Sequence, residues 1–211
     1  MRKNLDKLLK FFNLSKTSLM FLLGLLIIGI ICGSIFNVVI SKNDQTIVSN
    51  YLNEFIISVN NNKLSFIDCF KDSIMFNYAY ALIVWILGIS IIGLPIIIFM
   101  FFGKCFTLGF TVSAIIKNYG IKGCLLSLGY VFPHYVVNVV VFLIFTLYAT
   151  TLSIKMIKCI IKRKSIDFKP IMKKYTWILI TGLLIILITS IFEAFAMPKI
   201  LKFIITWVKI K

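Results

Sequence analysis

The sequence WILGISIIGLPIIIFMFFGKCFTLGFTVSAII, from Trp85 to Ile116, decides how the rest of the chain is interpreted. No residue between Ile74 and Gly103 is charged, and at about 1.5 Å per residue a helix of that length exceeds the ~30 Å hydrocarbon layer of a bilayer. The stretch therefore predicts a membrane-spanning helix. Pro95 lacks an amide hydrogen and lies close to Gly93, so we expect this helix to bend near the middle of the membrane.

Composition places the chain among multi-pass membrane proteins. It has 211 residues, 60% of them hydrophobic, and a mean hydropathy of +1.02. These values favour one membrane domain over residues 1–211 rather than one or two soluble domains. The expected fold is all-α, with about five transmembrane helices, some of them kinked, and short amphipathic helices at the interfaces.

The chain is strongly basic, with 23 Lys and Arg against 7 Asp and Glu and a net charge of +16. The basic residues flank apolar runs and form no single face, so anionic lipid headgroups are better counter-ions than nucleic acid. A genome that favours Lys, Ile and Asn codons would also produce part of this excess. The charge pattern predicts the lipid bilayer as a partner and no nucleic acid.

Uncharged runs and basic loops together predict five membrane crossings. The segment 155–174 holds eight Lys and Arg against one Asp, which is the strongest cytoplasmic signal in the chain. Residues 1–16 have the spacing of an amphipathic helix on the cytoplasmic membrane surface, and binding to a partner protein is the alternative. The expected crossings are 17–41, the bent helix around Pro95, a short tilted span at 103–117, a span at about 124–154 bent at Pro133, and 175–196.

Two amphipathic segments are expected on the external side of the membrane. Residues 42–73 are slightly acidic and place apolar residues at helical spacing, which predicts short amphipathic helices. The tail 198–211 has a similar pattern, although its four lysines oppose the positive-inside trend. Resting on the outer leaflet and binding a partner are equally good roles for these apolar faces. The candidate partner-binding residues are Leu52, Phe55, Ile56 and Trp207.

Polar residues inside apolar spans are the candidate functional residues, because an unpaired polar group in hydrocarbon costs several kcal/mol. His134 follows a proline, and Asn138 lies one helical turn later on the same face. Glu193 lies near the end of the fifth expected span. These three residues are interpreted either as interhelical hydrogen bonds that fix the packing of bent helices or as an ion or proton site.

The sequence contains no recognisable catalytic or metal-binding pattern. It has a single His, no G-x-S-x-G, no H-E-x-x-H and no Gly-rich phosphate loop, so we expect no enzyme activity and no cofactor. The cysteines are odd in number and include no C-x-x-C, which predicts neither a disulfide framework nor a metal site. They are Cys32, Cys69, Cys105, Cys124 and Cys159.

Several motifs resemble a known family. The sequences WILGISIIGLP at 85–95 and KCFTLGFTVS at 104–113 resemble the stage II sporulation protein M family of endospore-forming bacteria. Two weaker similarities are to Pro-His-Gly-x-x-Glu and Ile-Glu-Ala-Phe-x-x-Pro in the wider family. Here they read PHYVVN at 133–138, with Asn138 in place of Glu, and IFEAFAMP at 191–198. The loss of an ionisable group at Asn138 argues against a proton-coupled role there.

The resemblance implies a membrane scaffold that acts while the mother-cell membrane migrates around the forespore. Its implied partners are two peptidoglycan-degrading proteins, stage II sporulation proteins D and P, and its implied location is the sporulation septum and the engulfing membrane. The runner-up is a small transporter or channel that uses the kinked helices and the polar candidates. The sequence neither predicts nor excludes a homo-oligomer. The expected packing motif consists of Trp85, Gly88, Gly93, Pro95, Gly103, Lys104, Gly109 and Pro133.

Overall fold

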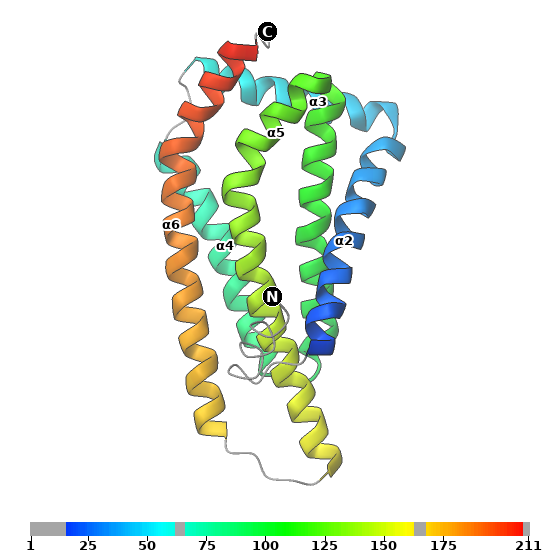
Figure 1. Cartoon of the computed structure of the whole chain (residues 1–211), viewed down its shortest axis with the longest axis vertical. Coiled ribbons are helices and arrows are strands. Elements are labelled where there is room, and N and C mark those ends of the chain that lie inside the picture. Colours follow the sequence, from blue (N-terminus) through cyan, green and yellow to red (C-terminus); the bar gives the residue numbers. More distant parts are fainter. Residues whose placement is uncertain (1–15, 62–65, 163–167, 209–211) are drawn as a thin grey trace.

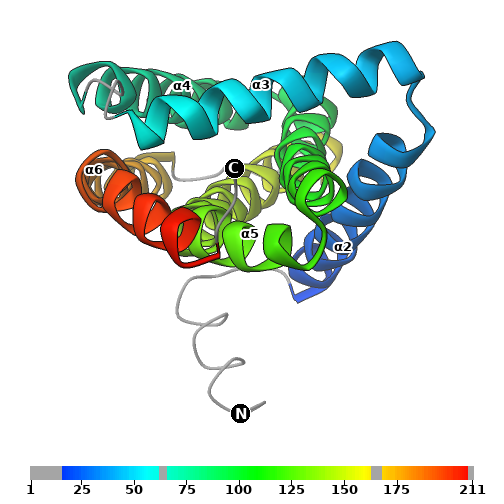
Figure 2. The same ribbon diagram turned by 90° about the horizontal axis from the view of Figure 1, so that it is seen from above.

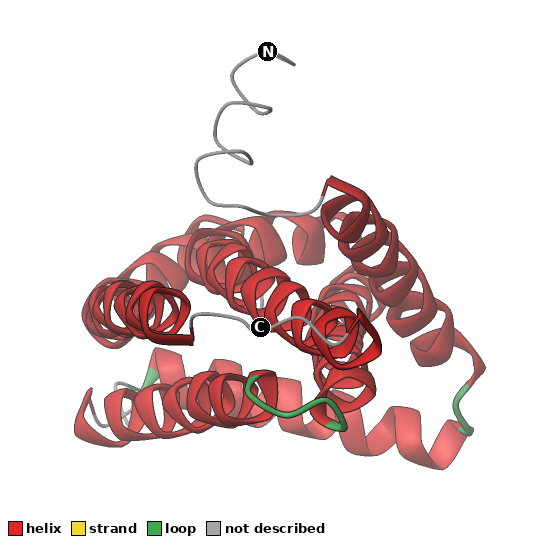
Figure 3. Ribbon diagram, turned by 90° about the horizontal axis from the view of Figure 1, so that it is seen from below, coloured by secondary structure: helices red, strands yellow, loops and turns green. Residues whose placement is uncertain are grey.

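The computed structural model describes residues 16–61, 66–162 and 168–208, and this part of the chain is helical with no strand (Figures 1 and 3). The expectation of an all-α membrane protein is therefore confirmed. The N-terminal residues 1–15, for which an amphipathic helix is predicted, lie outside the described residues. The helices are α2 (Lys16–Val39), α3 (Lys42–Asn60), α4 (Phe66–Gly88), α5 (Gly93–Lys162) and α6 (Phe168–Val208).

The helices run back and forth between two ends of a bundle (Figure 1). α2 runs from one end to the other, α3 lies across the far end, and α4 returns. α5 runs to the far end, reverses and comes back, and α6 then ends near α3. We call the end where α5 finishes and α6 begins the basic end, because Lys158, Lys169 and Lys173 lie there. The opposite end, which holds α3, is the cap end.

Four segments of the described chain are long and apolar enough to cross a membrane. α4 runs beside them from the cap end towards the basic end, and its first turns carry Lys71 and Asp72, which lower its average hydropathy. With α4 the bundle has five passes between its ends, in agreement with the approximate number expected. The four apolar segments are Lys16–Val39, Gly93–Gly129, Tyr135–Ile161 and Lys169–Ala196.

The single bent helix predicted around Pro95 is wrong. α4 ends at Gly88, a four-residue turn follows, and α5 begins at Gly93 and runs in the opposite direction. Pro95 lies exposed in the first turn of α5, where its missing amide hydrogen leaves no intrahelical bond unmade. The turn is tight, since a Cβ on Gly93 would lie 2.0 Å from the Leu87 carbonyl oxygen. The third pass consequently starts at Gly93 and is full length rather than short.

The chain reverses at Gly120 in the middle of α5. Gly120 has φ 60° and ψ −136°, a conformation that is essentially restricted to glycine, and it is the only positive-φ glycine in the described part of the chain. This reversal lies between the predicted third and fourth spans, 103–117 and 124–154. Pro133, where the fourth span was expected to bend, lies on a helical stretch after the reversal. At the C-terminal end, α6 continues through Pro198 to Val208, so the described part of the predicted tail extends the last spanning helix.

α2 packs closely along the first half of α5 because glycines face the contact. A Cβ on Gly33 would lie 2.1 Å from the Phe106 carbonyl oxygen, and one on Gly109 would lie 2.1 Å from the Ile30 carbonyl oxygen. Ser34 Oγ donates a hydrogen bond of 3.2 Å to the Gly109 carbonyl, across the two helices. Small residues thus bring the two backbones together and allow direct polar contacts between them.

Two main groups of buried side chains hold the remaining helices. One lies between α4, the second half of α5 and α6, and includes Val84, Phe142 and Ile186. The other lies at the cap end, where Ile56 of α3 packs with Leu201 near the end of α6. Figure 2 looks down on this cap end and shows α3 alongside the tops of the other helices.

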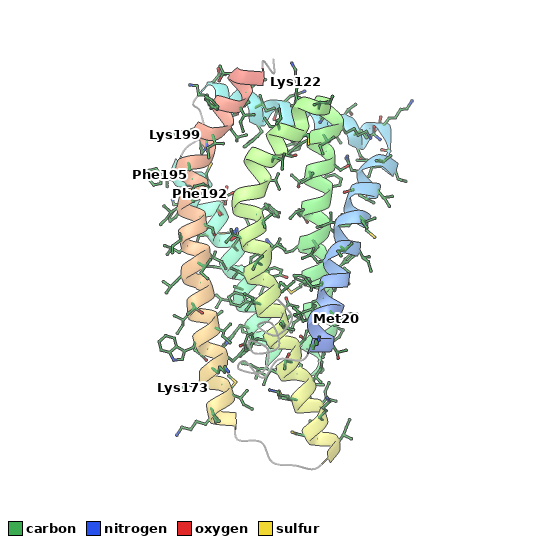
Figure 4. All side chains as sticks on the ribbon, in the orientation of Figure 1. Met20, Lys122, Lys173, Phe192, Phe195 and Lys199 are labelled. Carbon is green, nitrogen blue, oxygen red and sulfur yellow. The ribbon has the colours of Figure 1, made fainter. Side chains whose placement is uncertain are left out.

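The outer surface is apolar between the two ends, as a lipid-facing surface must be. Met20 is 65% exposed, and Phe192 and Phe195 point outward from α6 (Figure 4). Lys173 marks the basic end in this view, while Lys122 and Lys199 lie towards the cap end. Charged residues at both ends and apolar side chains between them are typical of a membrane-embedded bundle.

Candidate functional site

A cavity of about 410 Å³ lies between α4, both halves of α5 and α6. Its position is set by the fold, because helices far apart in the sequence meet around it. α4 and α5 supply equal shares of its wall, and the α4 residues lie one or two helical turns apart. The lining residues are Cys69, Asp72, Ser73, Phe76 and Asn77 of α4, Lys104, Tyr135, Asn138, Val139 and Phe142 of α5, and Glu193 of α6.

A chain of hydrogen bonds joins α4 to α6 at one side of the cavity. Ser73 Oγ donates to Glu193 Oε2 at 2.6 Å and lies 3.0 Å from Ser190 Oγ. Because Ser73 uses its only hydrogen on the carboxylate, Ser190 is the donor in the second contact. Asn77 Nδ2 lies 3.5 Å from Ser73 Oγ and completes the group. Glu193 is thus held by a hydroxyl from a neighbouring helix.

Lys104 brings a positive charge into the middle of the bundle. It lies eleven residues into α5, which at about 1.5 Å per residue is near the centre of the spanning region. Its Nζ lies 3.4 Å from Asn77 Oδ1 and 5.2 and 5.0 Å from the ring centroids of Tyr80 and Phe142. Faces of aromatic rings attract a cation, so these two rings and one amide oxygen surround the ammonium group.

Asn138 is almost completely buried and belongs to the same wall. It is 5% exposed, and its Oδ1 accepts a hydrogen bond of 2.8 Å from Thr189 Oγ1 of α6. Among the described residues, its Nδ2 has no hydrogen-bond acceptor, although Asn138 lines the cavity. The amide therefore links α5 to α6 on one side and offers a donor on the other.

The cavity has opposite charges at different depths. Lys104 lies on the third pass near the middle of the bundle, whereas Asp72 lies in the first turns of α4, towards the cap end. Glu193 adds a second carboxylate from α6. Neutral hydrogen-bonding groups, among them Ser73 and Asn138, also line the wall. This arrangement is suited to holding a small polar molecule or water, or to fixing the register of three helices.

The structure brings two of the three predicted polar residues to the same cavity. Asn138 and Glu193 both line it, while the side chain of His134 lies outside the described residues. The sequence reasoning missed Ser73 and Asn77, which lie one turn apart at the edge of the uncharged run. Their four-residue spacing on one helical face was the signal that would have found them.

The residues of the expected packing motif have different environments in the structure. Trp85 stacks on Tyr175, with ring centroids 5.9 Å apart, and Gly88 is in close contact with the Tyr175 hydroxyl. Gly103, by contrast, has no other atom within 4 Å of the position that a Cβ would take, so close packing does not require glycine there. Lys104 lines the cavity, with its ammonium group over the Tyr80 and Phe142 rings.

The expected partner-binding residues on α3 face inward. Ile56 is 4% exposed in the buried group at the cap end, and Leu52 and Phe55 pack against that group. The structure therefore contradicts the prediction that Ile56 offers a partner surface, because its apolar area is already covered by neighbouring helices. The side chain of Trp207 lies outside the described residues.

Within the described residues, no three His, Cys, Asp or Glu side chains are grouped as a metal-binding set. The polar residues that line the cavity carry an ammonium group, carboxylates, amides, hydroxyls and a thiol. Fold and site together define a multi-pass α-helical membrane protein with a cavity that charged and hydrogen-bonding side chains line in part.

The family model of stage II sporulation protein M matches residues 22–198. The chain therefore belongs to the stage II sporulation protein M family, as its motifs predicted. The match begins in α2 and ends at Pro198 in α6, so it includes all the helices around the cavity. Searches of curated proteins and of solved structures return no match.

Proposed function

We propose that the protein is a non-enzymatic membrane scaffold of sporulation engulfment, which holds peptidoglycan-degrading partners at the septal membrane. Membership in a sporulation membrane protein family supports the biological setting. The observation that supports the scaffold role is the folded cap end, where α3 packs against α6 in a buried apolar cluster. A rigid surface at one end of a membrane bundle is what a scaffold needs to present.

The proposed docking surface is the outer stripe of α3. Ile47, Tyr51 and Ile57 lie at helical spacing and are 54%, 72% and 56% exposed, and Glu54 on the same stripe is also exposed. The inward face of α3 is occupied by Ile56 and its neighbours, so the exposed apolar area of this helix lies on the stripe. Aromatic and aliphatic residues on a fixed helix are suitable anchors for a protein interface.

The proposed orientation places the basic end in the cytoplasm and the cap end on the wall side. The segment 155–174 is rich in Lys and Arg, and its described parts, 155–162 and 168–174, lie at the basic end. Such segments are retained in the cytoplasm. The proposed partners on the wall side are stage II sporulation proteins D and P. A scaffold on that side would bring them to the membrane that migrates around the forespore.

Co-purification of the full-length chain with these two proteins tests the proposal. The double variant Ile47→Ser, Tyr51→Ala should insert normally but lose most of the bound partner. Phe203→Ser is the matched control, because Phe203 is 70% exposed near the end of α6 and lies outside the stripe. Wild-type recovery of both partners by the double variant would contradict the docking claim.

The cavity favours a second candidate function, that of a small transporter or channel. Lys104 and Glu193 are ionisable groups inside a spanning bundle, where such groups often mark a substrate or ion pathway. Flux into proteoliposomes that disappears with Glu193→Gln, but not with Lys173→Gln at the basic end, would favour this function. Absence of flux with wild-type protein would exclude it.

A further inference from the structure

We propose that the cavity binds a small zwitterion, of the amino acid or dipeptide class, with its carboxylate on Lys104 and its ammonium group towards Glu193 and Asp72. The inference stands apart from the scaffold function, because the docking stripe on α3 contributes no residue to the cavity. It rests on the arrangement of charges, on an amide donor in the cavity wall, and on the size of the space.

Lys104 is the group that would receive the ligand carboxylate. Its ammonium has three hydrogens to donate, and among the described residues Asn77 Oδ1, at 3.4 Å, is its only hydrogen-bond acceptor. The Tyr80 and Phe142 rings stabilise the charge through their faces and supply no hydrogen-bond acceptor to it. A carboxylate beside Nζ would supply charge-assisted hydrogen bonds that the protein itself does not provide.

Asn138 adds a hydrogen-bond donor to the same site. It is 5% exposed, and its Oδ1 is occupied by Thr189, whereas its Nδ2 has no acceptor among the described residues. The amide lies on the cavity wall, where an oxygen of a bound molecule can accept a hydrogen from Nδ2. Asn138 shares the cavity wall with Lys104, so one ligand can contact both.

Glu193 and Asp72 would receive the ammonium group. Ser73 holds the Glu193 carboxylate in place through Oε2 at 2.6 Å, and Asp72 lies exposed on the cap side of the same cavity. A carboxylate that is already oriented by a hydroxyl needs little rearrangement to bind a cation. The inner end of the cavity thus favours a negative group and its outer part a positive one.

Only a molecule with both charges suits this arrangement. A simple cation would be repelled by Lys104, and a simple anion would be repelled by the two carboxylates, whereas a zwitterion matches both without adding net charge to the membrane interior. The cavity volume of about 410 Å³ lies within the range of small-molecule sites. Access from the cap end is consistent with Cys69 and Asp72, which line the cavity from the first turns of α4.

Ligand protection of Cys69 tests the proposal in the full-length chain. Cys32, Cys105, Cys124 and Cys159 are replaced by Ala, the protein is placed in lipid nanodiscs, and the rate of Cys69 modification by a thiol reagent is measured. Alanine and dialanine, each as both enantiomers, should slow the modification. Alanine amide and N-acetylalanine, which each carry one charge, should give at least tenfold weaker protection.

The variants Lys104→Met and Glu193→Gln should each weaken protection at least tenfold. Lys173→Met is the control, since Lys173 lies at the basic end away from the cavity. Gel filtration and helical circular dichroism identify any variant that fails to fold, and in that case Lys104→Gln replaces Lys104→Met. Equal protection by zwitterions and one-charge analogues would overturn the proposal. So would the absence of protection at about 10 mM, roughly ten times a weak Kd of about 1 mM.

Discussion

Replacing Gly33 by Ala should separate α2 from α5 and destabilise the bundle. The added methyl would lie 2.1 Å from the Phe106 carbonyl oxygen, about 1.3 Å short of an ordinary 3.4 Å contact. The nearest neighbours are backbone atoms of Phe106 and Phe110, which cannot turn away as a side chain can, so the helices must move apart. Overpacking of this kind costs about 1–3 kcal/mol.

The same separation would stretch the polar contacts between the two helices. Ser34 Oγ donates to the Gly109 carbonyl at 3.2 Å, and Asn37 Nδ2 donates to Ser113 Oγ at 3.2 Å. Hydrogen bonds between membrane helices contribute about 0.6 kcal/mol each on average. Overpacking and the loss of two such bonds together predict a destabilisation of about 2–4 kcal/mol for Gly33→Ala.

Reversible unfolding in mixed detergent micelles, followed by circular dichroism, measures this change. Gly24→Ala is the matched control on the same helix, because nothing lies within 4 Å of the added methyl. It should leave stability unchanged or raise it slightly, since alanine favours helix by up to about 1 kcal/mol over glycine. Equal stabilities of Gly33→Ala and Gly24→Ala would refute the close packing of α2 on α5.

Three further predictions concern the turns of the chain. Gly120→Ala should lower the free energy of unfolding by about 1–3 kcal/mol, because φ 60° with ψ −136° strains any residue that has a Cβ. Gly103→Ala is the control, since Gly103 lies at an open helical position and its replacement should not destabilise the protein. Thermal unfolding of the two variants measures the difference. Tyr175→Phe should lower the free energy of unfolding by about 1–3 kcal/mol, because the buried Tyr175 hydroxyl donates a hydrogen bond of 3.1 Å to the Trp85 carbonyl. An unchanged unfolding midpoint would show that this hydrogen bond is dispensable. Pro95→Ala should change the free energy of unfolding by less than about 1 kcal/mol, because proline is favoured in the first turn of a helix. A large loss of stability in the same assay would show that Pro95 has a structural role that this position does not explain.

The membrane class and the helical fold follow from the sequence because they depend on local quantities. Long uncharged runs must satisfy their backbone groups inside a bilayer, and the helix is the element that does so within one segment. The polar candidates Asn138 and Glu193 were recognisable for the same reason, since a polar residue in an apolar run stands out without knowledge of its neighbours. The family motifs likewise lie in continuous stretches of the chain.

Only the tertiary structure decided that the Gly and Pro residues at 88–95 separate two helices and do not kink a single one. The sequence from Gly88 to Pro95 is compatible with both a kinked helix and a turn. Contact of Gly88 with Tyr175, which is far away in the sequence, accompanies the turn. The environment of Lys104 could not be predicted from the sequence either, because the residues that surround its ammonium group, Asn77, Tyr80 and Phe142, come from other parts of the chain. Hydropathy and local motifs report what one segment prefers, whereas a cavity exists only where several segments meet.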